Sequence, residues 1–139
     1  MASVLRLQHV SIPIPAGGLE KGRAFYGDTL GLEQKPTPPA LDASRIAWFA
    51  LGETGDELHI LTEEADVRSQ GQHFCMQVDD LEAWRTRLGE RGVEVSETEP
   101  IVSRPRFMIR DPFGNRIELT QITGENYTDN PGDGTIREA

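Results

Sequence analysis

Three histidines and one glutamate stand where strand alternation would place them on a single face. They are His9, His59, His73 and Glu118, and these histidines are all that the chain has. Neutral imidazoles together with a carboxylate are a ligand set for a divalent first-row metal ion. The pattern therefore predicts a metal site formed by these four side chains. A polar cleft without metal is the alternative interpretation.

An internal repeat relates the four candidate ligands in pairs. Gln8-His9 opens one alternating stretch, and Gln72-His73 opens another 64 residues later. His59 and Glu118 are related in the same way, at a separation of 59 residues. In a pseudo-twofold arrangement of two such halves, the four side chains would converge on one point. Accidental similarity within an ordinary α+β sandwich is the competing explanation.

The fourth ligand position depends on strand register. Side chains alternate between the two faces of a strand, so His59 lies opposite Leu58 and Ile60. A register shift of two residues would put Glu57 at the ligand position instead. His59 is preferred, and Glu57 is its alternative.

Each half reads as a β-α-β-β-β module, so the predicted fold class is α+β. We expect two βαβββ modules forming a curved eight-stranded mixed sheet around a central cleft, with the helices outside. The expected helices span 18–30 and 81–90, with Asp79 or Asp80 as an N-cap and Gly31 and Gly92 as helix ends. The expected strands span 8–14, 32–36, 45–51, 57–62, 72–78, 93–98, 106–110 and 116–122.

Length and composition indicate one small globular domain. The 139 residues are assigned to a domain over 1–124, with module one at 4–62, module two at 72–122 and a loose tail at 125–139. The net charge of −9 argues against nucleic acid and anionic lipid as partners. A single cysteine excludes an internal disulfide, and the expected compartment is the cytoplasm.

Several stretches together resemble the vicinal oxygen chelate superfamily, the glyoxalase / bleomycin resistance / extradiol dioxygenase group. The resemblance covers most of residues 5–122, and its most specific stretch is Asp111-Pro112-Phe113-Gly114-Asn115 followed by Glu118. The other matching stretches are 7–10, 23–32, 57–60 and 73–81. The resemblance implies paired βαβββ modules around a metal site, and often a homodimer.

The resemblance also implies roles for individual residues. Metal-using members bind the metal through positions that match His9, His73 and Glu118. The fourth-strand position is Glu in glyoxalase I-like members and often Gln in epimerase-like ones, whereas this chain has His59. Fosfomycin-resistance and dioxygenase members use three protein ligands, so a fourth imidazole argues against those as well. Glu118 is the candidate catalytic base, and the implied cofactor is one divalent ion: Zn, Ni, Fe, Mn or Co.

Two function classes follow. One is a metal-dependent isomerase, lyase or dioxygenase acting on a small oxygen-chelating substrate, and the other is a non-catalytic, antibiotic-binding resistance protein. A domain with a purely structural metal is a third reading. Arg106 and Trp48 are candidate substrate-binding residues, with surface and core roles as their alternatives. Cys75 is interpreted as a small buried residue rather than a nucleophile.

Overall fold

The computed structural model describes residues 1–64 and 71–124, and it divides into two compact units. The first unit comprises Met1–Phe74 and Arg110–Arg116, and the second comprises Cys75–Ile109 and Ile117–Ala139. In chain order the elements are β1 (His9–Ile14), α1 (Leu19–Arg23), the π-helical turn η1 (Ala24–Thr29), β2 (Gln34–Lys35), β3 (Ile46–Leu51), β4 (Asp56–Thr62), β5 (His73–Gln77), α2 (Leu81–Glu90), β6 (Ser96–Glu97), β7 (Arg106–Arg110) and β8 (Arg116–Thr120). This order confirms the two βαβββ modules and the α+β class.

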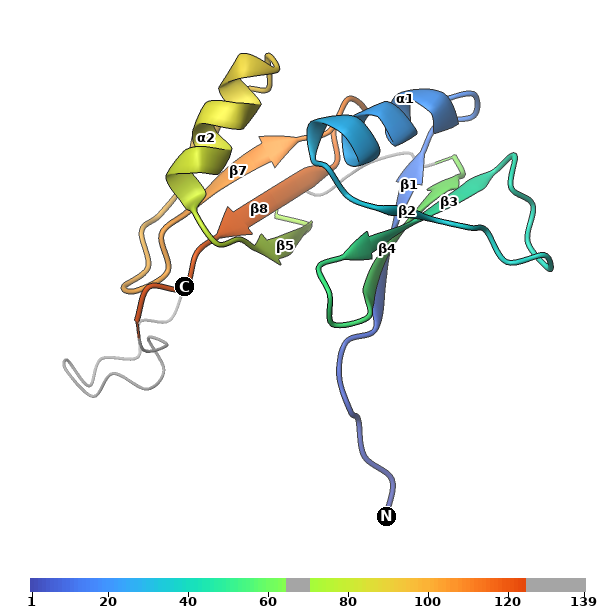
Figure 1. Ribbon diagram of the computed structural model, residues 1–139, viewed down its shortest axis with the longest axis horizontal. Coiled ribbons are helices and arrows are strands. Elements are labelled where there is room, and N and C mark those ends of the chain that lie inside the picture. The colour runs from blue at the N-terminus through green and yellow to red at the C-terminus, as the bar shows by residue number, and fades with distance from the viewer. Residues whose placement is uncertain (65–70, 125–139) are drawn as a thin grey trace. The chain divides into compact units, whose positions relative to one another are not determined.

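The first sheet has the strand order β1-β4-β3-β2 (Figure 1). β1 runs parallel to β4, while β3 is antiparallel to both β4 and β2. One face packs against α1 and η1 and is mostly apolar, with Thr62 as a buried polar residue at its end. The fully buried side chains at this contact include Ile14, Phe49, Leu58 and Ile60 of the sheet and Tyr26 of η1. Burying each such side chain contributes roughly 1.5–3 kcal/mol, so this face anchors the sheet whose other face is polar.

A close approach between α1 and β4 explains one glycine of the first helix. A Cβ at Gly22 would lie 2.7 Å from Ile60 Cδ1 and 3.6 Å from Ile14 Cδ1. The missing side chain lets the helix backbone sit directly on the apolar face of the sheet.

The turn between β7 and β8 belongs to the first unit and is fastened there by a buried carboxylate. Asp111 accepts hydrogen bonds from the Tyr26 hydroxyl (2.7 Å) and from the backbone N–H groups of Phe113 and Asn115 (2.9 and 2.8 Å). The Asn115 amide also donates to Asp111 Oδ2 and to the Pro13 carbonyl in β1. Gly114 takes a φ of 91°, which a glycine adopts without strain. The specific motif at 111–115 is thus explained by turn formation and by anchoring to β1 and η1.

The second sheet has the order β5-β8-β7-β6. α2 begins at the predicted cap, because the Asp80 side chain accepts from Ala83 N at 3.1 Å. The fully buried side chains of this unit include Leu88, Phe107, Ile117 and Leu119. Arg85 of α2 lies over the Phe107 ring of β7 with its guanidinium carbon 4.9 Å from the ring centroid.

The predicted elements agree with the structure except at the sheet edges and in the helix expected over 18–30, which is α-helical over Leu19–Arg23 and π-helical over Ala24–Thr29. The helix at 81–90, the Asp80 cap and the positive φ of Gly31 and Gly92 (73° and 74°) are confirmed. The strands expected over 32–36 and 93–98 are shorter, at Gln34–Lys35 and Ser96–Glu97. Both are edge strands with one neighbour, so fewer ladder bonds extend them. The tail predicted at 125–139 lies outside the described residues.

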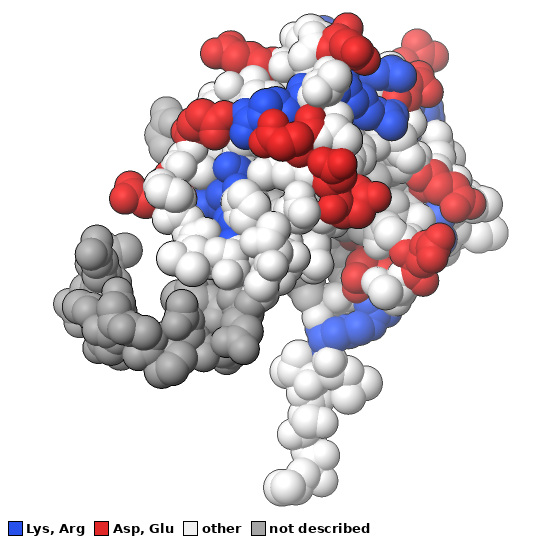
Figure 2. All heavy atoms as spheres, turned by 60° about the vertical axis from the view of Figure 1, so that its left-hand side comes forward, with Lys and Arg blue, Asp and Glu red and all other residues white. Residues whose placement is uncertain are grey.

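Charged side chains of both signs intermingle on the surface drawn in Figure 2. Exposed ion pairs include Arg85 with Glu82 (3.2 Å) and with Glu97, and Arg6 with Asp56. Pairs of this kind contribute little individually, since water and salt screen them. Within residues 1–64 and 71–124, no helix has the length and apolarity needed to cross a bilayer.

Candidate functional site

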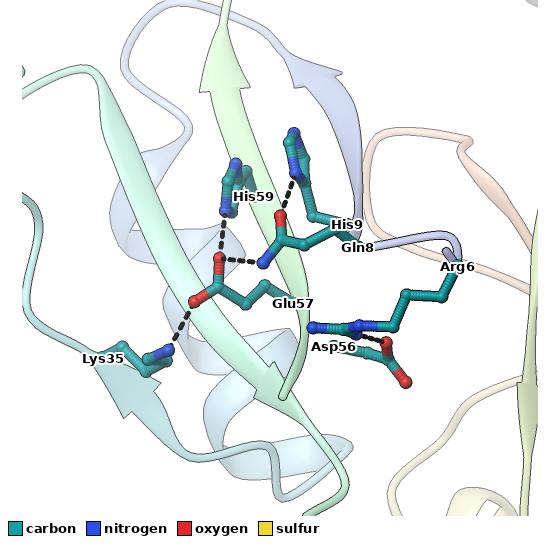
Figure 3. Close-up of polar contacts among 7 residues, drawn as sticks. All are labelled: Arg6, Gln8, His9, Lys35, Asp56, Glu57 and His59. Carbon is teal, nitrogen blue, oxygen red and sulfur yellow. Dashed lines mark hydrogen bonds and ion pairs between the residues drawn. The ribbon is translucent and has the colours of Figure 1, made fainter. Parts of the chain in front are cut away.

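The polar face of the first sheet gathers the candidate residues of the first module (Figure 3). His9 on β1 is registered with Glu57 on β4, and Trp48 on β3 is registered with His59. Registered partners share a face, and the alternation along β4 puts Glu57 and His59 on the same side. His59 and Glu57, the two alternatives for the fourth ligand position, are therefore neighbours on one face of the sheet.

Three aromatic rings stack across the three adjacent strands. The Trp48 and His59 rings lie 3.9 Å apart between centroids with 8° between planes. The His9 and His59 rings lie 4.2 Å apart with 21° between planes. His59 is the middle ring and is only 6% exposed, whereas His9 is exposed. Burial lowers the pKa of His59 below its usual 6.5, although the hydrogen bond to Glu57 partly opposes this shift.

Glu57 is the shared acceptor of this face. Its carboxylate contacts the Lys35 ammonium, and it accepts from His59 Nε2 (3.1 Å) and Gln8 Nε2 (3.3 Å). The Lys35 contact is the main reason that the pKa of this carboxyl falls from 4.5 to about 2, against the opposing effect of burial. Its side chain is 8% exposed. Residue alternation identified its face but not these three partners.

The hydrogen-bond partners determine which nitrogen of each imidazole carries the proton. An ionised carboxylate only accepts, so His59 donates from Nε2 and the lone pair of its neutral ring lies on Nδ1. Gln8 donates its Nε2 to Glu57, which directs its Oε1 to His9 Nδ1 at 2.6 Å. His9 therefore donates from Nδ1, and its neutral ring carries the lone pair on Nε2.

His73 at the start of β5 repeats the arrangement of His9. Its Nδ1 lies 2.7 Å from the Gly71 carbonyl oxygen, which only accepts. The neutral ring again carries its lone pair on Nε2. A histidine that binds a metal typically donates its other ring N–H to an oxygen in this way.

The second unit holds Glu118 and Arg106 as an ion pair. Arg106 Nη1 lies 2.7 Å from Glu118 Oε1, and the same guanidinium donates to the Glu99 carbonyl oxygen from Nε and Nη2. The two side chains are 18% and 11% exposed. The predicted substrate-binding arginine thus has intramolecular partners, and its role toward a substrate stays a prediction.

Cys75 is exposed, so the interpretation of a buried cysteine is wrong. Partial burial of the thiol, followed by the hydrogen bond and the charge of Glu118, raises its pKa to about 12. A thiol with so high a pKa is protonated at neutral pH and is a weak nucleophile. β5 exposes alternate residues, which is why this position faces solvent.

The donor chemistry fits three of the four predicted ligands. His9 and His73 each carry a lone pair on Nε2, and Glu118 is a carboxylate. His59 does not fit beside His9, because in-plane lone pairs of nearly parallel rings 4.2 Å apart do not meet at an ion about 2.0 Å from each nitrogen. Among the described residues, no three His, Cys, Asp or Glu side chains are grouped so as to hold a metal ion. Convergence of the predicted ligands stays a prediction.

Other members of the site were not predicted from the sequence. Gln8 and Lys35 join the network of Figure 3, and neither had been predicted as a site residue. Gln8 directly precedes His9 and recurs as Gln72 before His73, which was the available signal. Trp48, a predicted substrate-binding residue, stacks on His59, and its role toward a substrate stays a prediction. Its indole Nε1 is buried without a hydrogen-bond partner in the described part of the chain.

Comparison with known proteins places these features in a family. Residues 6–119 match the family described as the Glyoxalase/Bleomycin resistance protein/Dioxygenase superfamily. The chain is 31% identical over 131 residues to the mitochondrial methylmalonyl-CoA epimerase of Bos taurus, covering 84% of this chain and 74% of the relative.

Solved structures agree with this match. A putative glyoxalase family protein from Bacillus anthracis has a TM-score of 0.81 and 32% identity, covering 88% of this chain and 98% of that one. TnmS3, an antibiotic binding protein from Streptomyces sp. CB03234, has a TM-score of 0.67 and 26% identity, covering 88% and 99%. The chain belongs to the glyoxalase/bleomycin resistance protein/dioxygenase superfamily.

Proposed function

We propose that the protein is a divalent-metal-dependent enzyme acting on a small substrate that chelates through two oxygens. His9, His73 and Glu118 would hold the ion. The observation that supports this proposal is the shared proton arrangement of the two strand-opening histidines, since each donates from Nδ1 to an oxygen. That arrangement keeps a lone pair on Nε2, the form in which imidazole binds metal.

Chemistry of the isomerase or lyase type suits the residues best. A divalent ion would supply Lewis-acid polarisation of a substrate carbonyl. Glu118 would accept the proton from the adjacent carbon, as a carboxylate base. Arg106, 2.7 Å from Glu118, would balance the changing charge. The bovine relative is named as an epimerase, a class of enzyme that inverts one carbon centre.

Metal content is the first test of this proposal. Elemental analysis of the purified protein should find about one equivalent of a transition metal. The variants His9→Ala, His73→Ala and Glu118→Ala should each lose it, while Cys75→Ala, a change on the same strand as His73, should keep it. Full metal in the His73→Ala protein would contradict the ligand assignment.

Solvent exchange tests the chemistry separately from metal binding. The metal-loaded protein is incubated with methylmalonyl-CoA in D₂O, and loss of the α-proton signal is followed by NMR. Exchange by the wild type that disappears in Glu118→Gln protein loaded to the same metal content would support a proton-transfer enzyme with this acyl-CoA as substrate. Metal without exchange would reject that substrate and leave the enzyme class to be tested on other α-oxygenated acids and ketones.

A binding protein without catalysis is the second candidate, favoured by the likeness to the antibiotic-binding structure. It predicts no metal after incubation with each of Zn, Ni, Fe, Mn and Co. It also predicts tight binding of a planar aromatic antibiotic with no turnover. The metal analysis above therefore separates the two candidates.

A homodimer remains part of the proposal. Large apolar side chains are exposed in the extended segment before β1, namely Val4 (92%), Leu5 (92%) and Leu7 (73%) (Figure 1). Exposed apolar groups in a row favour association. Sedimentation velocity of the full chain should give a dimer, and Leu5→Ser with Leu7→Ser should shift it toward monomer. A monomeric wild type would contradict the proposed homodimer.

The cytoplasmic location of the protein stays a prediction.

A further inference from the structure

We infer that His59 is a positioning residue that holds the His9 ring by stacking, and that the metal of the proposed function has three protein ligands rather than four. The inference rests on the proposed function for the identity of the bound group. It departs from the four-ligand set that residue alternation predicted. Two observations support the inference. The rings of Trp48, His59 and His9 form a stack, and hydrogen bonds fix the imidazoles of His59 and His9.

His59 uses both ring faces and its Nε2 proton in contacts within the first unit. Both of its ring faces are covered, by Trp48 at 3.9 Å and by His9 at 4.2 Å. Its Nε2 proton is directed at Glu57, whose carboxylate is also in contact with the Lys35 ammonium. A ligand role would require either Nδ1 or the breaking of the Glu57 hydrogen bond. Neither change would make its in-plane lone pair converge with that of His9.

His9, by contrast, is exposed and is held in place by its neighbours. Gln8 accepts its Nδ1 proton at 2.6 Å, and the His59 ring supports one face. The two supports are linked, because Gln8 and His59 both donate to Glu57 Oε1. Glu57 therefore fixes the orientation of His9 through the amide and through the stack. This is how groups behind a metal ligand set its tautomer and ring plane.

Three protein ligands alter what the site can accept. With one fewer imidazole on the ion, more coordination positions remain for a substrate that binds through two adjacent oxygens. His59 would then no longer argue against the members of the superfamily that use three protein ligands. Substrates of the fosfomycin-resistance and dioxygenase type therefore also become candidates for testing.

The decisive experiment makes the same substitution at the two stacked histidines. Purified His59→Phe and His9→Phe proteins are titrated with Co²⁺, and the visible d–d spectrum reports both affinity and coordination. Phenylalanine keeps a flat ring in the stack and removes both nitrogens. We expect His59→Phe to bind one equivalent with an affinity within about threefold of wild type and an unchanged spectrum. His9→Phe should weaken binding by more than about 100-fold, beyond the 10–100-fold typical of a supporting residue.

His59→Ala tests the positioning role. Loss of the His59 ring should weaken Co²⁺ binding by about tenfold without changing the intensity of the d–d spectrum. His59→Phe, which keeps a ring in the stack, should restore the affinity. If His59→Phe loses Co²⁺ as severely as His9→Phe, or its spectrum changes coordination, His59 is a ligand and the inference is wrong. If His59→Ala binds as wild type does, the positioning role is wrong.

A measurement on the metal-free protein keeps the inference testable if the proposed function fails. Long-range ¹H–¹⁵N NMR should find the Nε2–H tautomer at His59 and the Nδ1–H tautomer at His9. The His9 ring protons should be shifted upfield by the stack and should move downfield in His59→Ala. Unchanged His9 shifts in that variant would overturn the inference. A wild type that binds no metal, with these shifts as expected, would overturn only the metal-dependent function.

Discussion

The two units use a buried carboxylate on the polar face in different ways. Glu57 and Glu118 are both nearly buried, and each pairs with a cation: Glu57 with Lys35 on β2, two strands away, and Glu118 with Arg106 on the adjacent strand β7. Glu57 also accepts from His59 and Gln8. Beside Glu118 lies the Cys75 thiol, whose proton the carboxylate helps to retain. Glu57 fixes the orientation of the His59 and His9 imidazoles, whereas Glu118 contacts the Arg106 guanidinium and the Cys75 thiol.

This difference shows that the position of a carboxylate on a face does not define its role. Both residues follow the alternation of a strand in the middle of a four-stranded sheet. Their roles depend on which side chains surround them: the His59 imidazole and the Gln8 amide donate to Glu57, whereas the Arg106 guanidinium donates to Glu118. We therefore assign Glu57 to positioning, and we propose Glu118 as the ligand and base.

Removing Glu57 should give the largest effect on stability. In Glu57→Ala the donors of His59 and Gln8 lose their acceptor, and Lys35 loses its counter-ion. We expect the free energy of unfolding to fall by about 2 kcal/mol, below the cost of breaking a fully buried pair because Lys35 is part-exposed. Lys35→Ala should cost less than about 1 kcal/mol. Urea denaturation measures both, and equal losses would show that Glu57 acts only through the ion pair.

The same carboxylate should make stability depend on acid pH. Folding lowers the pKa of Glu57 from 4.5 to about 2. Its stabilising contribution is therefore fully present above pH 4.5 and is lost as the pH falls through 2. The melting temperature of the wild type should fall over this window more steeply than that of Glu57→Gln. Parallel curves for the two proteins would mean that Glu57 titrates normally in the folded state.

Strand alternation and helix signals were enough to predict the local structure from the sequence. Asp80 and the apolar spacing after it correctly predicted the helix at 81–90. Alternation placed His9 and His59 on one face, as their stacked rings confirm. These predictions succeed because helix capping and strand alternation depend on residues close in sequence.

Features that depend on pairing between strands were beyond this reasoning. Lys35 lies in a two-residue strand and reaches Glu57 across β3, which no local pattern indicates. The stack of His59 between Trp48 and His9 depends on the registers of three strands. Convergence of His9 with His73 and Glu118 depends on how the two modules are arranged, and alternation within a strand carries no information about that.

Thiol chemistry sharpens the comparison in the second unit. Because the Glu118 carboxylate contributes to the raised pKa of Cys75, Glu118→Gln should lower that pKa and increase the thiolate fraction. The reaction of the metal-free protein with iodoacetamide at pH 8 should accelerate several-fold. Glu57→Gln, the matched change in the first unit, should leave the rate unchanged. Equal rates in all three proteins would show that burial alone sets the thiol pKa.

Trp48 fluorescence gives the smallest and most local signal. The chain has two tryptophans, so Trp84→Phe leaves Trp48 as the only emitter. A protonated imidazole stacked on indole quenches its emission, and burial lowers the pKa of His59 below 6.5. Emission should therefore stay constant from neutral pH down to 6.5 and fall only at lower pH. Adding His59→Phe should remove the transition. A midpoint at or above 6.5 would mean that the hydrogen bond and charge of Glu57 outweigh the burial of His59 between its two stacked neighbours.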